Sequence, residues 1–337
     1  MNTATTPRVS IGLPVYNGER YLRETLESLL AQTFGDFELV ISDNASTDAT
    51  EAICREFASR DPRIRYHRNP ENVGGSRNFC RVFELARAPY FKWSAHDDLC
   101  AATFLEKCVA VLDADPEVVL CYPKSGFIDQ AGGYLSDHED GCNLTGSRPS
   151  ERVLQFFVTG STYCFPMFGV IRRQALARTT LIAPYVCSDQ VLLVQLALAG
   201  KFVEVPERLF FFREHPNRSI RQLKSFADYM KWHDPRKGSR IQLPRWRLAW
   251  EFVQSIRRSG VGWSESARSL IAVLKWCRWH QASLAADLVM TVRQAATLLT
   301  RATPIPDMVS LPPPGSAPSN AGGPNQGTGS VAGIEAR

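Results

Sequence analysis

The sequence predicts an α/β fold, in which a mostly parallel, Rossmann-like sheet carries helices on both faces and is followed by a C-terminal helical extension. Strand-like and helical patterns alternate about five times over roughly the first 120 residues, which is typical of a parallel sheet with crossover helices. Hydrophobic residues make up 44% of the 337 residues, enough for a large core. Six of the seven tryptophans fall in residues 225–305, where long helical patterns replace the alternation.

The first four elements follow from the spacing of apolar residues. Residues 8–15, RVSIGLPV, form an apolar run that predicts a buried strand. Leucines at intervals of three and four residues predict an amphipathic helix over 19–32. FELVISD, residues 37–43, predicts the second strand. Asp48 followed by Glu51 is typical of a helix N-terminus, so a helix is expected from there to about residue 59.

The same alternation continues to residue 122 and then weakens. Strands are predicted at 63–68, 90–94 and 118–122, and helices at 76–87 and 102–113. Residues 131–149 are rich in Gly, Ser and Asp and are expected to form a loop. Residues 187–200 predict a helix with Ser188 as its N-cap and Gly200 at its end. Two strands, KFVEV and LFFFREH, are expected after it.

The charge distribution predicts three parts. The net charge of +5 is uneven, because residues 1–220 carry 23 basic and 27 acidic side chains whereas residues 221–309 carry 15 and 6. Residues 1–220 are therefore expected to form the sheet domain, and 221–309 a basic, tryptophan-rich helical extension. Residues 310–337 are rich in Pro, Gly and Ser and predict a disordered tail.

Cysteine usage and the N-terminus favour a cytoplasmic protein. The nine cysteines lack C-x-x-C spacing and mostly lie in apolar stretches, which favours reduced thiols over disulfides or a zinc site. The N-terminus lacks the basic and apolar segments of a signal peptide. No uncharged apolar run reaches the ~18 residues of a membrane-spanning helix. Any membrane contact is thus expected to be peripheral, at the inner face of the cell membrane.

Two adjacent carboxylates, Asp97 and Asp98, follow the fourth predicted strand in the stretch WSAHDDLC. Neighbouring carboxylates repel each other unless solvent, a basic group or a cation compensates. A Mg²⁺ or Mn²⁺ ion shared with substrate phosphates would do so, and the alternatives are helix capping and solvent contact. Asp43 ends the second strand, and parallel sheets bind ligands beyond the carboxyl ends of their strands. We therefore expect Asp43, Asp97 and Asp98 to share one site.

The stretch IGLPVYNGERYLRETLESLLAQTFGDFELVISDNASTD resembles the opening of inverting family 2 glycosyltransferases, which have the GT-A fold. NPENVGGSRNF and the strand-borne HDD extend the resemblance over about residues 8–110, and a looser likeness continues to about 215. The resemblance implies a hexosyltransferase-type catalytic domain at 1–220. Such an enzyme moves a sugar from a nucleotide-diphosphate donor to a glycan, glycolipid or other hydroxyl acceptor, with inversion and with Mg²⁺ or Mn²⁺ as cofactor. It also implies a role in cell-surface polysaccharide or glycoconjugate biosynthesis.

The resemblance assigns donor-binding roles to five residues. Pro14, Tyr16 and Asn17 are expected to line the nucleotide pocket. Asp43 corresponds to the aspartate that binds the base or the ribose, since a carboxylate can accept a hydrogen bond from either. A turn with the next residue is the alternative for this aspartate. Arg77, just after a glycine pair, corresponds to the basic residue near the nucleotide, with a surface arginine at a helix start as the alternative.

The acidic motif departs from the D-x-D pattern of the family, because Ala95 stands at the first acidic position. Asp97 aligns best with the metal-binding aspartate, with Asp98 beside it. His96 either replaces the lost contact or lies exposed in the loop. His215 corresponds to a histidine that contacts the metal or the diphosphate in some members, with a structural or surface histidine as the alternative. The missing aspartate leaves open a catalytically inactive sugar-nucleotide- or glycan-binding protein.

Inverting transfer needs a base that accepts the proton of the acceptor hydroxyl. The family places this base at the start of a later helix, and Asp189 in CSDQVLL matches that place, where the first helical turn favours the ionised form. The alternative is an acidic residue that lies at the start of a helix and has no catalytic role. A nucleotidyltransferase would show a glycine-rich loop near the first strand and a dehydrogenase a G-x-G-x-x-G motif, and neither pattern is present.

Two interpretations of the basic segment at 225–305 remain open from the sequence. Basic charge with tryptophan at an apolar border suits contact with an anionic membrane surface, as a lipid-linked acceptor would require. The alternative is a helical subdomain packed on the catalytic domain with its basic residues solvated. Nucleic-acid binding is not expected, because no RNA- or DNA-binding motif accompanies the charge.

Overall fold

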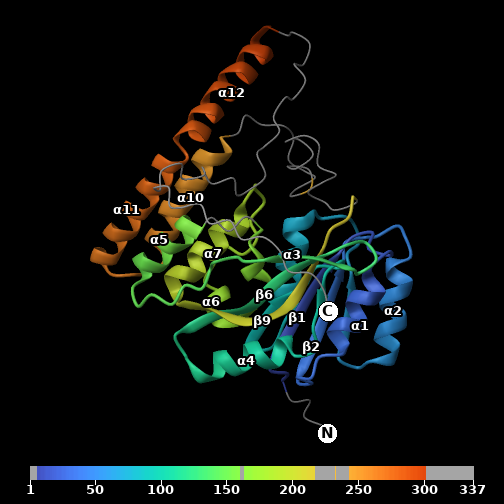
Figure 1. Cartoon of the computed structure of the whole chain (residues 1–337). Helices are drawn as coiled ribbons and strands as arrows, with labels where there is room; N and C mark the ends of the chain where they lie inside the picture. The colour runs from blue at the N-terminus through green and yellow to red at the C-terminus, as the bar shows by residue number, and fades with distance from the viewer. Residues whose placement is uncertain (1–5, 160–162, 217–231, 233–242, 301–337) are drawn as a thin grey trace, which may run out of the picture.

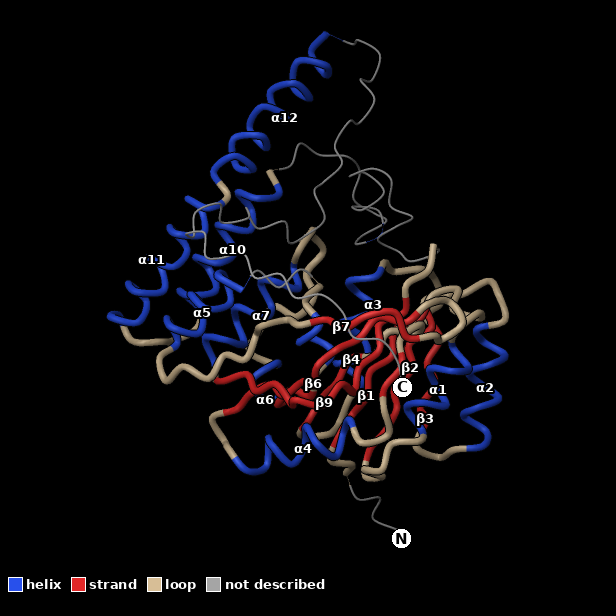
Figure 2. Tube along the Cα trace, in the orientation of Figure 1, coloured by secondary structure: helices blue, strands red, loops and turns tan. Residues whose placement is uncertain are grey.

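A computed structural model describes residues 6–159, 163–216, 232 and 243–300, with side chains up to residue 292. Nine strands form one sheet: β1 (Val9–Val15), β2 (Phe37–Asp43), β3 (Ile64–Arg68), β4 (Tyr90–Trp93), β5 (Leu99–Cys100), β6 (Val118–Ile128), β7 (Tyr134–His138), β8 (Val170–Arg172) and β9 (Lys201–Arg213). Their order is β3-β2-β1-β4-β8-β6-β9-β5, and β7 pairs with β6. Helices lie on both sides of this sheet (Figures 1 and 2).

The first four strands in this order carry the predicted alternation. β3, β2, β1 and β4 pair in parallel, with Val15 opposite Asp43 and Asp43 opposite Arg68. β1 and β2 are buried along their whole length, as expected of parallel strands that helices cover on both faces. The carboxyl ends of these strands therefore meet at one edge of the sheet.

Beyond β4 the sheet is mixed. β8 runs antiparallel to β4 and β6, whereas β6 and β9 pair in parallel. β6 continues past Pro123 through a shift in register, and a single β9 replaces the two strands predicted there. The predicted α/β class, with helices on both faces and a helical C-terminal region, is confirmed.

Two apolar layers enclose the sheet. One contains β1 residues such as Ile11 and Leu13 together with apolar residues of α1, α2 and α4. The other contains apolar residues of α3, α5 and α7, and Gly12 allows α3 to approach, since a Cβ there would lie 2.8 Å from Val82. The helices are α1 (Leu22–Leu30), α2 (Thr50–Arg60), α3 (Gly75–Leu85), α4 (Phe104–Ala114), α5 (Pro149–Thr159), α6 (Arg173–Leu176) and α7 (Ser188–Ala199), with a 3₁₀ turn at Phe165–Phe168.

Local predictions differ from the structure at two places in the middle of the chain. The segment 131–149, predicted as a loop, contains β7 and leads into α5, which the sequence did not indicate. The helix predicted from residue 187 begins at Ser188, whose predecessor Cys187 is the N-cap with φ 60°. Ser188 is thus the first helical residue and not the cap. Gly200 follows the last residue of this helix, as predicted.

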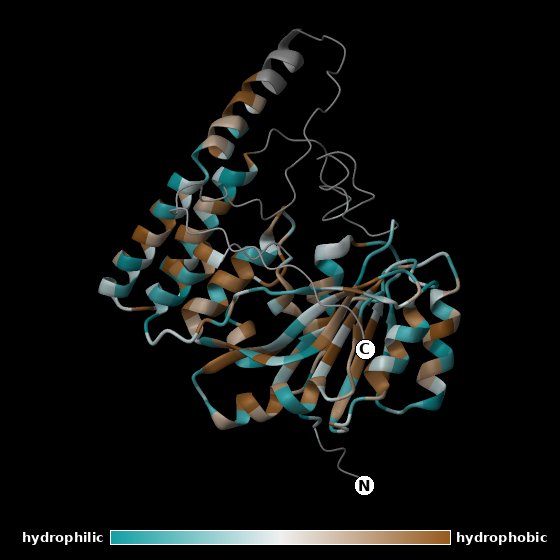
Figure 3. Ribbon diagram, in the orientation of Figure 1, coloured by the Kyte–Doolittle hydropathy of each residue, from teal (hydrophilic) through white to brown (hydrophobic). Residues whose placement is uncertain are grey.

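Three further helices follow: α10 (Pro244–Arg258), α11 (Trp263–Trp279) and α12 (Gln281–Thr300). α10 and α11 pack on α5 and α7, with the Phe252 ring centroid 4.9 Å from Phe157 and 5.2 Å from Trp276. α12 extends away from the rest of the protein (Figure 1), and hydropathy colouring shows apolar residues both in the strands and along the helices (Figure 3). Among the described helices, none has the length and apolar character needed to span a membrane. The predicted tail at 310–337 lies outside the described residues.

Candidate functional site

Three predicted site segments reach the same edge of the sheet. The loop after β1 carries Tyr16 and Asn17, β2 ends at Asp43, and the loop after β4 carries Asp97. β1 lies between β2 and β4, so the carboxyl ends of three adjacent parallel strands deliver these side chains. The strand order thus brings together residues that are as much as 81 positions apart, from 16 to 97.

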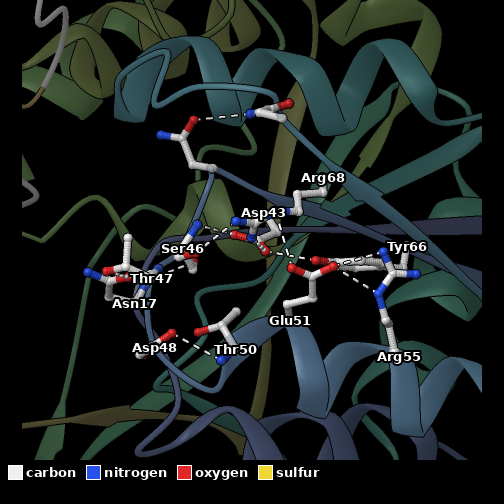
Figure 4. Close-up of polar contacts among 12 residues, drawn as sticks. Asn17, Asp43, Ser46, Thr47, Asp48, Thr50, Glu51, Arg55, Tyr66 and Arg68 are labelled. Carbon is white, nitrogen blue, oxygen red and sulfur yellow. Dashed lines mark hydrogen bonds and ion pairs between the residues drawn. The ribbon is translucent and has the colours of Figure 1, made fainter.

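Asp43 is fully buried, and both of its carboxylate oxygens are engaged (Figure 4). One oxygen accepts a hydrogen bond of 2.8 Å from the backbone N–H of Ser46. The other accepts from the Tyr66 hydroxyl at 2.7 Å and from the Arg68 guanidinium at 2.8 Å. Burial and the neighbouring Asp43 raise the pKa of Tyr66, which keeps its hydroxyl a donor. These bonds fix the orientation of a charged group at the end of β2.

The loop after β1 is tied to the loop after β2. Asn17 has φ 50°, a left-handed conformation that asparagine tolerates better than most residues. Its side-chain oxygen accepts from the Thr47 N–H at 2.9 Å, and its own N–H donates to Ser46 Oγ at 2.9 Å. Tyr16 is 45% exposed next to it. Pro14, in contrast, is buried within β1, so it shapes the end of the strand and offers little open surface.

Arg77 is not brought to this group. Its guanidinium pairs with Glu84 at 2.5 Å on the exposed side of α3, where about half of each side chain is accessible. The next residue, Asn78, points inward and accepts a hydrogen bond of 2.7 Å from the Ser42 hydroxyl. The asparagine, and not the predicted arginine, therefore links α3 to β2.

A buried pair, Asp97 and His215, is the centre of a second cluster. Asp97 Oδ2 lies 2.9 Å from His215 Nε2, although the two residues are 118 positions apart in the sequence. They are only 6% and 4% exposed. The His215 ring packs on Tyr21 with 4.7 Å between ring centroids. Two of the three predicted metal ligands therefore lie in contact.

Asp98 faces a different partner. Its Oδ1 accepts a hydrogen bond of 3.0 Å from the backbone N–H of Arg213. The fully buried Arg213 guanidinium donates to the Asp97 carbonyl oxygen at 3.0 Å and to Glu24 Oε2 at 2.7 Å. Arg213 thereby fastens the acidic loop to the end of β9.

The residues of this cluster fit a divalent cation in part. Asp97 offers carboxylate oxygens and His215 an imidazole, a mixed donor set that first-row divalent metals accept. The Nδ1 atom of His215 is buried and has no hydrogen-bond partner among the described residues. Within the part of the chain that the structure describes, no three His, Cys, Asp or Glu side chains are grouped closely enough to hold a metal. A cation here would need further ligands, such as the oxygen atoms of a diphosphate.

His96, proposed as a substitute for the missing aspartate, is partly buried against the loop after β1. A Cβ added at Gly18 would lie 2.7 Å from its ring, so the ring packs on this glycine. The Thr25 hydroxyl donates to the His96 carbonyl oxygen at 2.9 Å and fixes the backbone there. The histidine therefore lies between the Asn17 loop and the Asp97 cluster.

Asp189 lies in the first turn of α7, as predicted. Desolvation raises the pKa of its carboxyl group above the ordinary value, although backbone and Cys164 hydrogen bonds act in the opposite direction. The expected preference for the ionised form is therefore wrong, because desolvation outweighs these hydrogen bonds at the start of the helix. Cys164 and Cys187, the N-cap of α7, have φ values of 51° and 60°. Left-handed conformations cost non-glycine residues about 1–3 kcal/mol and cluster at functional sites. Among the described residues, no hydrogen bond or ion pair joins Asp189 to Asp43 or Asp97.

Four residues that position these carboxylates were not predicted: Tyr21, Tyr66, Arg68 and Arg213. The strand period of two could have indicated Tyr66 and Arg68, since they lie on the same side of β3. Arg213 lies two positions before His215, but nothing local in the sequence distinguishes a buried arginine from a surface one.

Comparison with known proteins identifies the family. The profile described as glycosyl transferase family 2 matches residues 10–180, which is half of the chain. The protein named "Putative glycosyltransferase EpsH" of Bacillus subtilis (strain 168) is 28% identical over 211 residues, which cover 62% of this chain and 56% of that protein. An uncharacterized glycosyltransferase of Methanocaldococcus jannaschii is 30% identical over 133 residues, covering 39% and 46%. The chain thus spans only about half the length of these relatives.

Solved structures show the same fold at lower identity. Residues 1–349 of TarS from S. aureus, in complex with UDP-GlcNAc, match with a TM-score of 0.61 and 15% identity over 85% of this chain and 81% of that chain. The mannosyltransferase PcManGT from Pyrobaculum calidifontis, in complex with GDP-Man and Mn²⁺, matches with a TM-score of 0.50 and 20% identity over 88% and 80%. With the profile match over half of its length, the chain belongs to glycosyl transferase family 2.

Proposed function

We propose that this chain is an inverting glycosyltransferase of the hexosyl type, which uses a nucleotide-diphosphate sugar and a divalent cation. The observation that carries the proposal is the edge of the sheet where the buried Asp43 follows β2 and the buried Asp97, paired with His215, follows β4, with β1 between these two strands. TarS and PcManGT, which share the fold, have been solved with UDP-GlcNAc and with GDP-Man and Mn²⁺. The acceptor would be a glycan, a glycolipid or another hydroxyl compound in cell-surface polysaccharide or glycoconjugate biosynthesis in the cytoplasm.

Donor binding would use the groups at the ends of β1 and β2. The Asp43 carboxylate can accept a hydrogen bond from a base N–H or a ribose hydroxyl, because its Ser46 and Arg68 contacts hold it in place. Tyr16 is exposed enough to stack on a base. Hydrogen bonds join the loop after β1 to the loop after β2, so these loops need little ordering when the nucleotide binds.

Asp97 and His215 would hold Mg²⁺ or Mn²⁺ together with donor phosphate oxygens. When bound, the cation would neutralise the charge that develops on the diphosphate leaving group. Arg213 keeps the acidic loop in place through the Asp97 carbonyl oxygen. The Tyr21 ring holds the imidazole against the same loop.

Asp189 would accept the proton of the acceptor hydroxyl. As the hydroxyl oxygen forms its bond to the anomeric carbon, the bond from that carbon to the diphosphate oxygen breaks, and one displacement inverts the configuration. A carboxyl with a raised pKa is a stronger base than an ordinary aspartate, which favours the proton transfer.

Calorimetry with UDP, GDP and dTDP, each with and without Mn²⁺, tests the donor site. We expect wild-type protein to bind one nucleotide in a metal-dependent manner. Asp97→Asn should lose the metal dependence, and Asp43→Asn should weaken binding even without metal. Asp36→Asn is a matched control, because Asp36 is exposed and lies before the opposite end of β2.

The missing first aspartate favours one other candidate, a catalytically inactive protein that binds a sugar nucleotide or glycan on the same fold. Donor turnover with the nucleotide found by calorimetry separates the two. Transfer or slow donor hydrolysis that disappears in Asp189→Asn supports an enzyme. Tight nucleotide binding with no turnover for any matching sugar would instead support the binding protein.

We also propose peripheral contact with an anionic membrane surface through the segment 225–305, on the described helix α11. Trp263, Ile271 and Leu274 are 87%, 53% and 68% exposed and lie on one face of this helix. Lys275 and Arg278 are exposed beside them. Exposed tryptophan with neighbouring basic residues suits the interface of anionic lipids. The opposite face of α11 packs on the protein, so both interpretations of the basic segment apply to one helix.

A further inference from the structure

A cavity of about 620 Å³ lies at the other edge of the sheet, where β1 and β4 begin. Four arginines line it, Arg8, Arg87, Arg172 and Arg173, together with Tyr90, and its lining contains no acidic residue. It lies away from Asp43 and Asp97, which follow the carboxyl ends of these parallel strands. None of the roles assigned above uses it.

Three chain segments converge to form this cavity. Arg8 precedes β1, Arg87 precedes β4, and Arg172 ends β8. β8 runs antiparallel to β4, with Arg172 opposite Tyr90, so the end of one strand reaches the start of the other. Arg173 then begins α6, and its backbone N–H donates to the Pro89 carbonyl oxygen at 2.8 Å. Arg172 and Arg173 therefore lie on secondary structure, and Arg8 and Arg87 lie within three residues of the start of a strand.

The carboxylates around the cavity do not match all of its positive charge. Arg8 is paired with Asp113 at 2.7 Å. Arg87 shares the single carboxylate of Glu38, at 3.2 Å, with Arg65 at 2.8 Å. The single negative charge of Glu38 therefore neutralises only one of the two guanidinium groups, Arg65 and Arg87.

The other two arginines have no carboxylate partner among the described residues. Arg172 donates to backbone carbonyl oxygens, including that of Val118 at 2.7 Å, so it holds the structure together. Arg173 has a buried Nε without any hydrogen-bond partner among the described residues, and its guanidinium lies over the Phe83 ring at 5.2 Å. A buried donor without an acceptor is unfavourable, and the fork of a guanidinium matches phosphate oxygens.

We propose that this cavity is a second ligand site, which binds a phosphate-bearing molecule through Arg173 and Arg87. The volume lies within the range of small-molecule sites and exceeds that of one phosphate ion, so the ligand would be a diphosphate or a phosphate ester. Arg173 would donate from its terminal nitrogens, and Arg87 would add charge from the rim. Arg172 and Arg8 would keep their present partners and would contribute to the positive electrostatic potential in the cavity.

Calorimetry with inorganic diphosphate, in metal-free buffer with the donor site filled by the nucleotide found above, tests this site. We expect Arg173→Gln to weaken diphosphate binding by about tenfold or more, and Arg173→Lys to restore only part of it because an ammonium lacks the fork. Arg178→Gln is the matched control, since Arg178 is exposed outside the cavity. Unchanged nucleotide affinity and unchanged Tm in Arg173→Gln would separate this site from the donor site and from misfolding.

Two outcomes would overturn the proposal: diphosphate binding that Asp43→Asn abolishes and Arg173→Gln leaves unchanged, or no diphosphate binding at all. Both leave the glycosyltransferase proposal intact, because that rests on nucleotide binding. Vesicles of phosphatidylcholine with and without phosphatidic acid identify the source of the phosphate. Vesicle binding that depends on phosphatidic acid and on Arg173 supports a lipid headgroup, whereas diphosphate binding alone supports a free phosphate compound.

Discussion

Buried charged side chains decide the chemistry at the carboxyl edge of the sheet. Asp43, Asp97 and Arg213 are each at most 6% exposed, and each has hydrogen-bond partners from a distant part of the chain. A buried charge persists only when it is paired and hydrogen-bonded. Removing one partner therefore costs more than the loss of one contact, because it leaves the other charge uncompensated.

Replacing His215 by Asn is expected to abolish the metal dependence of nucleotide binding while leaving metal-free binding within about twofold. The amide keeps a polar group next to Asp97 but provides a poorer metal ligand than imidazole. Calorimetry with and without Mn²⁺ measures this. A variant whose binding still responds to Mn²⁺ as wild type does would remove His215 from the proposed cation site.

Asp189→Asn is expected to lower kcat by about 10²–10⁴-fold, because general base catalysis contributes about that much. In the wild type, kcat/KM should fall with acid at a pH above 3.8, the ordinary pKa, since burial raises the pKa of this carboxyl and the base must be ionised. Initial rates across a pH series measure both effects. If the decline of kcat/KM at acidic pH is the same in Asp189→Asn as in wild type, another group causes that decline.

The same substitution is expected to stabilise the protein at neutral pH. Because the folded-state pKa of Asp189 is raised, the stability linked to its neutral form is complete at low pH and is lost as pH rises through that pKa. Asparagine remains neutral throughout, so its Tm should exceed that of wild type near pH 7 and converge with it in acid. A lower Tm at pH 7 would show that the ionised carboxylate stabilises the fold.

Among the secondary-structure elements, β8 and α11 carry features that the local sequence does not explain. β8 has only three residues, yet its antiparallel pairing places Arg172 next to Tyr90 and so forms one wall of the arginine-lined cavity. α11 buries Ala272, Val273 and Trp276 against the protein and exposes an apolar face on its other side. An exposed apolar face of this kind is characteristic of an interaction surface.

Trp263→Ser with Leu274→Ser is expected to reduce partitioning onto vesicles containing anionic phospholipid by about tenfold or more, since burial of each side chain contributes about 1.5–3 kcal/mol. Leu135→Ser is the matched control, because Leu135 is 55% exposed but lies on β7. Vesicle flotation measures the bound fraction. Equal losses in control and double variant, or self-association of wild type that the double variant abolishes, would contradict membrane contact through α11.

For the molecule as a whole, the C-terminal helices share a hydrophobic core with the sheet domain. Phe157 of α5 contacts Phe252 of α10, which in turn contacts Trp276 of α11. The same apolar cluster reaches Trp93 in β4, immediately before the acidic loop. The expected boundary at residue 220 thus separates two charge patterns within a chain whose described parts are packed together.

Thermal unfolding of the full chain is accordingly expected to give a single transition in calorimetry. Trp276→Ala should lower the free energy of unfolding by about 3–5 kcal/mol, because it opens a large cavity between α5, α10 and α11. The whole transition should move to lower temperature. Two separate transitions, of which Trp276→Ala moves only one, would indicate that the helical extension unfolds independently.

The amino-acid sequence alone determined the α/β class, most elements of the first 122 residues, and the helical C-terminal region. These follow from apolar periodicity, which reports locally on which face of an element is buried. The position of Asp43 at the end of β2, and of the two carboxylates just after β4, likewise follows from local patterns. The mixed half of the sheet was less predictable, because Pro123 interrupts the pattern of β6 and one long β9 replaces two expected strands.

Only the tertiary structure decided which side chains meet. It joined Asp97 to His215 across 118 positions, turned Asp98 toward the Arg213 backbone, and left Arg77 on the exposed side of α3. It also gathered arginines from three segments around one cavity. The reason is physical: pairing of distant charges depends on strand order and direction, which arise from packing of the whole chain and leave no periodic signal in the neighbouring residues.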